Sequence, residues 1–168
     1  MPYKKLKPIA VAAGYGFPQL SEVFELVAGK GLLNIELKQA GHEEAAIRLA
    51  RGILPVDSFA FSSFDPAAVR TCRRVAPDVP AFLIVWGPQD GARDVAALRE
   101  LDASGIAFES GHLSAELTRL FCRERFPLFV WTVNDVCEAV RLAEWGVTGI
   151  ITDIPAELVT AMNPSGKG

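Results

Sequence analysis

The chain has 168 residues, of which 50% are hydrophobic and 22% are charged, and its formal net charge is −3. This length fits one domain, and the apolar fraction is too high for an intrinsically disordered protein. The slightly acidic balance excludes the basic surface that binds nucleic acid and argues against a surface that attaches to anionic lipids.

Six short apolar runs, most of them bounded by Gly or Pro and rich in aromatic or β-branched residues, predict buried strands. Their first residues lie 21 to 27 positions apart, and the runs cover 32–37, 59–63, 81–86, 106–109, 128–133 and 149–152. Apolar residues at helical spacing fill the gaps between them, as at 20–27, 46–50, 117–121 and 136–143.

Capping residues agree with this alternation of strands and helices. Helix starts are predicted at Asp65, Ser114 and Asn134-Asp135, and Gly52, Gly105 and Gly146 are expected to mark helix ends. An alternating pattern of this kind predicts a parallel sheet. No Gly-rich phosphate loop is present, and polar residues instead follow several different strands, as in the sites of α/β barrels.

The segment 34–38 is the strongest candidate for chemistry. Side chains alternate along a strand, so Asn34, Glu36 and Lys38 share one face, while Ile35 and Leu37 face the covering helices. In one interpretation Glu36 is a ligand for a hard cation and Lys38 contacts a phosphate oxygen. In the other, the two residues form a structural ion pair, and their spacing leaves both interpretations open.

The second strand ends in two serines. We expect Asp65 to cap the following helix, and Ser62 and Ser63 to satisfy backbone groups of the turn rather than to line a polar site. No Gly-x-Ser-x-Gly elbow surrounds either serine, which argues against a serine hydrolase.

Two tryptophans follow later strands at the same end of the predicted sheet. Trp131 either packs on the apolar part of a ligand or is a large core residue. Trp86 follows the third strand and is placed to cover the same mouth, whereas Asn134 is expected to be a helix cap rather than a ligand contact.

The sequence contains two histidines. His42 lies at the expected start of a helix. His112 lies in a loop after the fourth strand, near Glu109, where it is either a general base or a solvated loop residue. The two are not placed to serve together as acid and base.

Cysteine usage and the apolar runs bear on the compartment. Cys72, Cys122 and Cys137 have neither the spacing of a zinc site nor that of a disulfide framework. No run approaches the ~18 apolar residues of a membrane helix, and the N-terminal apolar run is too short for a secretory signal. We therefore expect a cytoplasmic protein with reduced thiols.

Taken in order and at their spacings, four of these motifs resemble those of the glycerophosphodiester phosphodiesterase family. They are 34–38, 61–65, 130–135 and 146–155, and the stretch 16–23 resembles the helix opening before the first of them. The resemblance covers about Leu6–Pro155. It implies an α/β barrel that uses Ca or Mg to hydrolyse glycerophosphodiesters to an alcohol and glycerol 3-phosphate. It also implies that Glu36 is a metal ligand, that Lys38 contacts the phosphate and that Trp131 lies near the substrate.

In the family, two catalytic histidines and two further metal ligands precede the segment that 6–16 resembles. They therefore have no counterpart here, and neither His42 nor His112 matches the histidines. The resemblance therefore implies an incomplete (β/α) TIM-type barrel with about six parallel strands, where a closed barrel has eight. We expect one truncated domain over 1–162, a flexible tail over 163–168, no catalytic residue in this chain, and weak or no binding of Mg or Ca.

Two functions are consistent with this reading. In the first, the chain is a pseudoenzyme of the phosphoric diester hydrolase family, associated with lipid and glycerol metabolism, that binds a glycerophosphodiester or phosphate through Lys38 and is catalytically inactive alone. The alternative is an active metal-dependent glycerophosphodiesterase whose site is completed by another chain.

An unclosed sheet leaves two apolar edges, at Leu33–Leu37 and Gly149–Thr152. Edges of this kind tend to pair with another chain, so we expect a homo-oligomer, in particular a dimer, and no nucleic-acid or membrane partner. Alternatively, Met1–Ala13 folds over an edge, with Ile9–Ala12 as a short strand.

Overall fold

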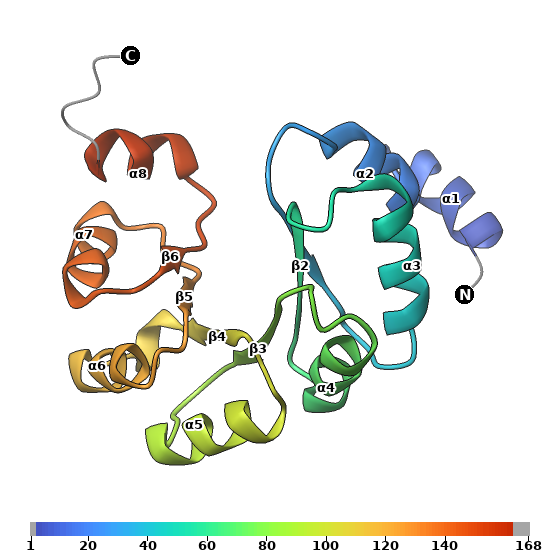
Figure 1. Ribbon diagram of the computed structural model, residues 1–168. Helices are drawn as coiled ribbons and strands as arrows, with labels where there is room; N and C mark the ends of the chain where they lie inside the picture. The colour runs from blue at the N-terminus through green and yellow to red at the C-terminus, as the bar shows by residue number, and fades with distance from the viewer. Residues whose placement is uncertain (1–2, 163–168) are drawn as a thin grey trace.

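The computed structural model describes residues 3–162, in which six parallel strands alternate with helices (Figure 1). The strands are β1 (Leu33–Glu36), β2 (Phe59–Ser63), β3 (Ala81–Val85), β4 (Gly105–Glu109), β5 (Leu128–Trp131) and β6 (Gly149–Ile150). The helices are α1 (Tyr3–Ala12), α2 (Leu20–Val27), α3 (Glu43–Ile53), α4 (Pro66–Val75), α5 (Gly91–Glu100), α6 (Ala115–Arg123), α7 (Val136–Trp145) and α8 (Pro155–Met162), with a 3-10 helix, η1 (Ser110–His112), after β4. The expected flexible tail, 163–168, lies outside the described residues.

The six strands form one sheet in the order β1-β2-β3-β4-β5-β6, so each strand pairs with its neighbours in sequence. The sheet curls, with the strands at the centre and helices around the outside, and β1 and β6 are its two end strands (Figure 1). The predicted incomplete (β/α) TIM-type barrel with six parallel strands is therefore confirmed.

The core lies between the convex face of the sheet and the surrounding helices. Ile106 of β4 is in register with Leu128 of β5, and Phe108 with Val130. All four side chains are fully buried, and the Phe108 ring lies 6.2 Å, centroid to centroid, from that of Phe121 in α6. Because side chains alternate along a strand, the residues between these core positions face the concave side.

Several predicted caps are confirmed. The side chains of Asp65 and Ser114 accept hydrogen bonds from backbone N–H groups in the first turns of α4 and α6, and Gly146 ends α7 with a φ of 95°. The prediction was wrong for Gly52, which lies inside α3, and for Gly105, which is the first residue of β4.

Gly105 has a packing role rather than a capping one. A Cβ atom at this position would lie 2.4 Å from the backbone oxygen of Pro127, at the start of the neighbouring strand. The close approach of two backbones therefore requires glycine here.

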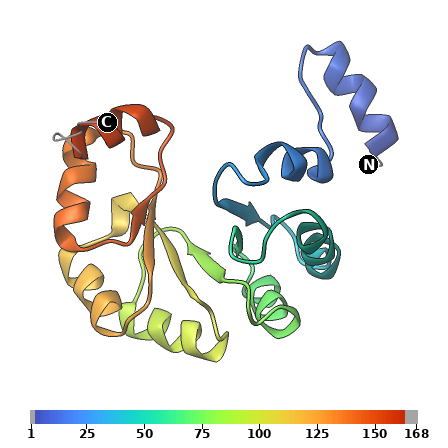
Figure 2. The same ribbon diagram turned by 45° about the horizontal axis from the view of Figure 1, so that its top comes forward.

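The suggestion that Ile9–Ala12 forms a strand over a sheet edge was wrong. These residues belong to helix α1, which stands apart from the sheet (Figure 2). This apolar run is short, and two of its four residues are alanine, which has the highest helix propensity. Local hydrogen bonds, such as that from Ala13 N to Ile9 O, also favour the helix. Among residues 3–162, no helix has the length and apolar character needed to cross a membrane.

Candidate functional site

The predicted site residues lie at the carboxyl ends of the strands, on the concave side of the sheet. Glu36 at the end of β1 is in register with Ser62 of β2, and Glu109 at the end of β4 is in register with Trp131 of β5. The neighbours of these residues along each strand point toward the helices, so these four side chains share the concave face. We call this end of the sheet the rim.

Glu36 and Lys38 form an ion pair at the rim, with 2.5 Å between Lys38 Nζ and Glu36 Oε1. The predicted alternation is confirmed, because Ile35 and Leu37 are buried while Asn34, Glu36 and Lys38 are exposed. The Lys38 side chain is 75% exposed and that of Glu36 is 31% exposed, so neither charge is buried without water. This ion pair is the contact that the structural interpretation requires, and it leaves the Lys38 ammonium open to a second anion.

An aromatic pair connects Lys38 to Trp131. The Lys38 ammonium lies 5.9 Å from the centroid of the Phe64 ring, within the range of a cation–π contact. The Phe64 ring in turn meets the Trp131 ring edge-on, with 5.7 Å between centroids and 89° between planes. The curl of the sheet thus brings the ends of β2 and β5 together, although two strands lie between them.

Trp131 is oriented by a hydrogen bond as well as by this stacking. Its indole Nε1 donates to the backbone oxygen of Ala107 on β4 at 3.1 Å, and the residue is half-buried. One part of the ring system is therefore held by the sheet while another part remains accessible at the rim. Trp131 is not a fully buried core residue.

Phe64 is a rim residue that the sequence interpretation did not single out. It follows Ser62 by two positions, and continuing the alternation of β2 would have placed it on the concave face. It is 46% exposed, and its ring contacts Lys38 and Trp131.

The prediction that the serines bond to backbone groups is confirmed for Ser63 and was wrong for Ser62, whose hydroxyl bonds to a side chain on β1 instead. Ser63 Oγ donates to the backbone oxygen of Leu37 at 2.6 Å and accepts from the backbone N–H of Asp65 at 3.0 Å. Ser62 Oγ accepts from the side-chain amide of Asn34 at 3.0 Å. Both serines are buried, so their hydroxyls join β1 to β2 beneath the rim.

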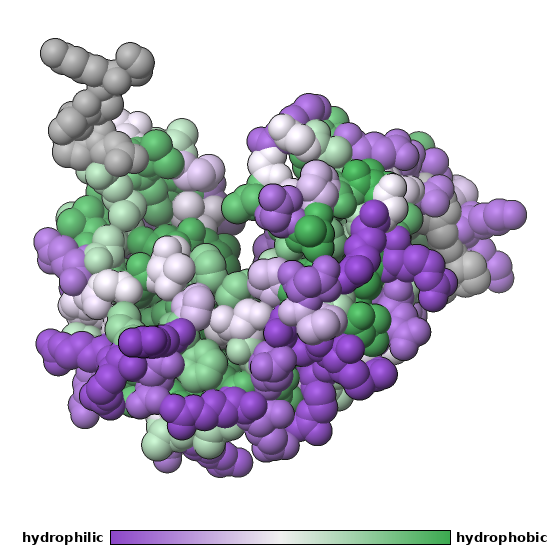
Figure 3. Space-filling view, in the orientation of Figure 1, coloured by the Kyte–Doolittle hydropathy of each residue, from purple (hydrophilic) through white to green (hydrophobic). Residues whose placement is uncertain are grey.

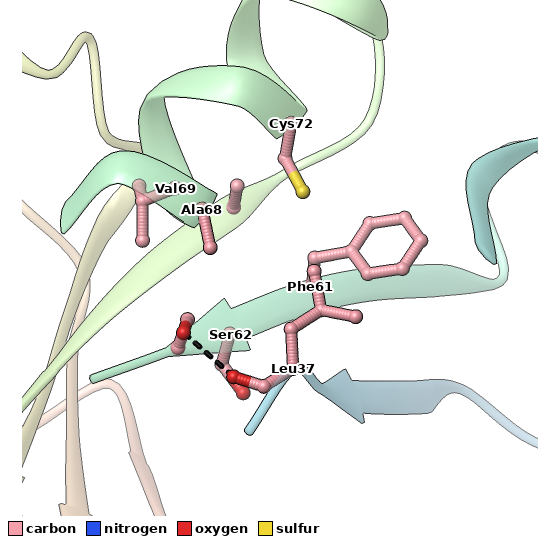
Figure 4. A pocket seen from close by; sticks show the side chains of 8 residues that line it. Leu37, Phe61, Ser62, Ala68, Val69 and Cys72 are labelled. Carbon is pink, nitrogen blue, oxygen red and sulfur yellow. Dashed lines mark hydrogen bonds between the residues drawn. The ribbon is translucent and has the colours of Figure 1, made fainter. Parts of the chain in front are cut away.

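The seam beneath these serines is packed and offers no ligand cavity. It lies between β2 and α4, is lined by apolar side chains including Phe61, Val69 and Cys72, and has no room for a water molecule (Figure 4). Burial, and secondarily the charge of Glu43, raises the pKa of the Cys72 thiol to about 11, so this cysteine remains an inert core thiol.

Asn134 differs from the prediction. It was expected to cap α7, but Asp135 does so, by accepting from the backbone N–H of Glu138 at 2.7 Å. The Asn134 side chain instead joins the ends of β5 and β6: its Oδ1 accepts from Thr152 Oγ1 and from the backbone N–H of Asp153, at 3.0 and 2.9 Å. This cross-link lies just beyond the last residues of β5 and β6, both of which end earlier than predicted.

The remaining candidates are Trp86 and the two histidines. Trp86, after β3, is 72% exposed, and its carbonyl accepts from the Gln89 side chain at 3.0 Å. His42 is the residue before α3 and makes no side-chain capping hydrogen bond there. His112 is not merely solvated, because its Nδ1 lies 2.5 Å from Glu109 Oε2.

The hard cation that the resemblance implies needs more ligands than these residues supply. Mg or Ca takes about six oxygen ligands, several of them carboxylates. Within residues 3–162, no three side chains of His, Cys, Asp or Glu lie close enough together to hold a metal ion, and Glu36 bonds to Lys38. The residues of the described chain do not by themselves fit such a cation, although Glu36 supplies one oxygen donor of the right kind.

The surface at the opening of the sheet is mixed in character. A hollow separates the two ends of the curled sheet, and hydrophobic and polar residues lie side by side on its walls (Figure 3). Exposed apolar side chains on or beside this concave side include Phe64, Trp86 and Ile151.

Comparison with known proteins supports the arrangement. The model of the glycerophosphoryl diester phosphodiesterase family matches residues 2–157. A glycerophosphodiester phosphodiesterase of Caldanaerobacter subterraneus is 31% identical over 162 residues, which cover 92% of this chain and 65% of the relative.

Solved structures give the same result. A protein of Silicibacter pomeroyi described as a glycerophosphoryl diester phosphodiesterase superposes with a TM-score of 0.78 at 26% identity, over 89% of this chain and 57% of that one. A phosphodiesterase of Oleispira antarctica, solved in complex with its product sn-glycerol-3-phosphate, superposes with a TM-score of 0.77 at 25% identity, over 87% of this chain and 61% of that one. The chain thus spans about three-fifths of the length of these relatives, and it belongs to the glycerophosphoryl diester phosphodiesterase family.

Proposed function

We propose that this chain binds the phosphate of a glycerol phosphate or glycerophosphodiester at the rim and does not hydrolyse it by itself. The observation that carries the proposal is the exposed Lys38 ammonium above the Phe64 ring, which in turn packs against Trp131. An ammonium supplies charge for a phosphate oxygen, and an aromatic surface packs against the carbon chain of the ester. The relative from Oleispira antarctica, whose structure holds sn-glycerol-3-phosphate, supports the choice of ligand.

The proposed lack of turnover rests on what hydrolysis of a phosphodiester demands. Charge on the phosphate must be neutralised, a proton must leave the attacking hydroxyl, and another must reach the departing alcohol. At the rim, Lys38 is already paired with the carboxylate that would serve as a metal ligand, and His42 lies before α3 rather than beside His112. Loss of such groups reduces catalytic rates by orders of magnitude.

The alternative is an active enzyme whose site is completed by another chain. The observation that favours it is the sheet itself, whose end strands β1 and β6 each have one strand neighbour within residues 3–162. An end strand presents unpaired backbone N–H and C=O groups, to which a second chain can add. In this case the rim of one chain would supply Lys38 and Trp131, and the partner would supply proton-transfer groups and further oxygen ligands.

One set of assays tests both. Calorimetric titration with sn-glycerol-3-phosphate is expected to show binding that Lys38→Ala weakens at least about fivefold, because the ammonium is the charge that faces the phosphate. Lys30→Ala is the matched control, because Lys30 is an exposed lysine that precedes β1 and lies at the opposite end of the strand. Equal affinity of wild type and Lys38→Ala would refute binding at the rim.

Hydrolysis of glycerophosphocholine with Mg or Ca is measured in the same samples, for wild type and for Glu36→Ala. Metal-dependent turnover that Glu36→Ala abolishes would refute the inactive form of the proposal. If the specific activity rises with protein concentration, the site completed by a second chain is the better account.

A further inference from the structure

Glu109 and His112 form a second polar group at the rim, outside the set that the family resemblance supplies. Glu109 is the last residue of β4, and its side chain shares the concave face with Trp131, its partner in register on β5. His112 ends η1, the single turn that follows β4. The imidazole Nδ1 and the carboxylate Oε2 lie 2.5 Å apart.

The turn that carries this pair holds it in place. A Cβ atom at Gly111 would lie 3.1 Å from Glu109 Oε1, so glycine lets the carboxylate fold back against the turn. Leu113, the next residue, is buried, and its backbone N–H donates to Ser110 O at 3.1 Å. The carboxylate therefore holds the imidazole, and the buried Leu113 holds the backbone that follows it, although the His112 side chain remains 40% exposed.

The contact with Glu109 also decides which nitrogen faces a ligand. A carboxylate accepts the Nδ1 proton of a histidine, so Nε2 of the neutral ring carries the lone pair. Within residues 3–162, Nε2 has no hydrogen-bond partner. An oriented Nε2 lone pair accepts a hydrogen bond from a hydroxyl group, and an alkyl group at the same place would leave it unpaired.

Trp131 connects this pair to Lys38. Its ring contacts Phe64, over which Lys38 lies, and its backbone is in register with Glu109. An ester whose phosphate lies at Lys38 and whose carbon chain packs on the two rings extends along the rim toward β4. The group that it would meet there is the imidazole of His112, whose Nε2, within the described residues, is free to hydrogen-bond to a hydroxyl.

We propose that Glu109 and His112 form a hydroxyl-binding site that selects phosphate esters of polyols over phosphate esters of simple alkyl alcohols. Glu109 is the positioning residue, and His112 Nε2 accepts the hydrogen bond from a hydroxyl of the alcohol part. The inference rests on the proposed binding of phosphate at Lys38, and it adds a residue that determines which ester is bound.

The test compares sn-glycerol-3-phosphate with propyl phosphate, which has the same three-carbon chain but no hydroxyl group. Wild type is expected to bind glycerol phosphate about tenfold more tightly, the size of one hydrogen bond, and His112→Ala is expected to bind both esters equally. Glu109→Ala is expected to reduce the preference as well, because it releases Nδ1. His42→Ala is the matched control and keeps the preference, because His42 lies before α3 and not on η1.

Nuclear magnetic resonance gives a second readout. The imidazole signals of His112 should shift when glycerol phosphate is added and not when propyl phosphate is added. A preference that survives in His112→Ala would overturn the inference while leaving phosphate binding intact. If wild type bound neither ester, or if Lys38→Ala bound glycerol phosphate as tightly as wild type, the proposed function and this inference would both be overturned.

Discussion

Asp94 is a buried carboxylate whose stability contribution can be worked out from its surroundings. It lies in the first turn of α5, is 8% exposed, and its Oδ2 has no hydrogen-bond partner within the described residues. Burial, and secondarily the charge of Asp90, raises its pKa, and the charge of Arg93 lowers it; the net result is a pKa of about 6 in place of 3.8. The folded protein therefore resists ionisation of this group.

The shift predicts a pH-dependent penalty. In the unfolded chain Asp94 loses its proton near pH 3.8, and in the folded protein near pH 6, so between these values the folded state binds more protons. The free energy of unfolding therefore falls as the pH rises through this window, by about 3 kcal/mol at 1.36 kcal/mol per pKa unit. The higher free energy of unfolding is fully present below pH 3.8, where the group is protonated in both states, and it is lost above about pH 6.

Asp94→Asn removes the charge and keeps the shape of the side chain. At pH 8 the variant is expected to be about 1–2 kcal/mol more stable than wild type, because the ~3 kcal/mol ionisation penalty is partly offset by an amide that lacks a buried partner. At pH 4 this advantage should disappear, because the wild-type carboxyl is then neutral in the folded protein.

Urea unfolding followed by tryptophan fluorescence at pH 4, 5, 6, 7 and 8 measures the difference between the two proteins. Asp57→Asn, at an exposed loop position, is the control and should change stability by less than about 0.5 kcal/mol at each pH. A difference between wild type and Asp94→Asn that stays constant from pH 4 to pH 8 would refute the reasoning. An increase in the stability of wild type relative to Asp94→Asn as the pH rises would refute it as well.

Three further predictions follow from packing and exposure. Gly105→Ala should lower the free energy of unfolding, measured in urea, by more than about 2 kcal/mol, because the new Cβ would lie 2.4 Å from the Pro127 backbone oxygen. A decrease of less than about 0.5 kcal/mol would contradict this close contact. With a thiol reagent at pH 8, the exposed Cys122 and Cys137 should react within minutes, whereas Cys72, with its pKa of about 11, should react only on unfolding. Mass spectrometry of the labelled peptides measures the reaction of each cysteine. Fast labelling of Cys72 in the folded protein would contradict this expectation. Light scattering at micromolar concentration should give a dimer mass, since β1 and β6 are end strands, and a monomer mass would count against pairing of the edges.

Features set by hydrogen bonds and alternation within a few residues could be predicted from the sequence. The exposed Asn34, Glu36 and Lys38, with Ile35 and Leu37 buried between them, follow from the two-residue period of a strand. The caps at Asp65 and Ser114 follow from side chains that bond to backbone groups two or three positions away. Six such units in succession also determined the parallel order of the sheet.

Features that depend on how far the sheet curls could not be predicted in this way. The contact between Phe64 and Trp131 joins strands that are not neighbours, and the role of Asn134 depends on β6 lying beside β5. Glu109 and His112 are close in sequence, but whether the imidazole turns back to the carboxylate depends on the backbone of η1. The alternation of strand and helix, together with the order of its motifs, determined the family and the strand on which each candidate residue lies. Only the tertiary structure decided that Lys38, Phe64 and Trp131 are joined into one surface, because that contact requires the ends of β1, β2 and β5 to converge on the concave side of the sheet.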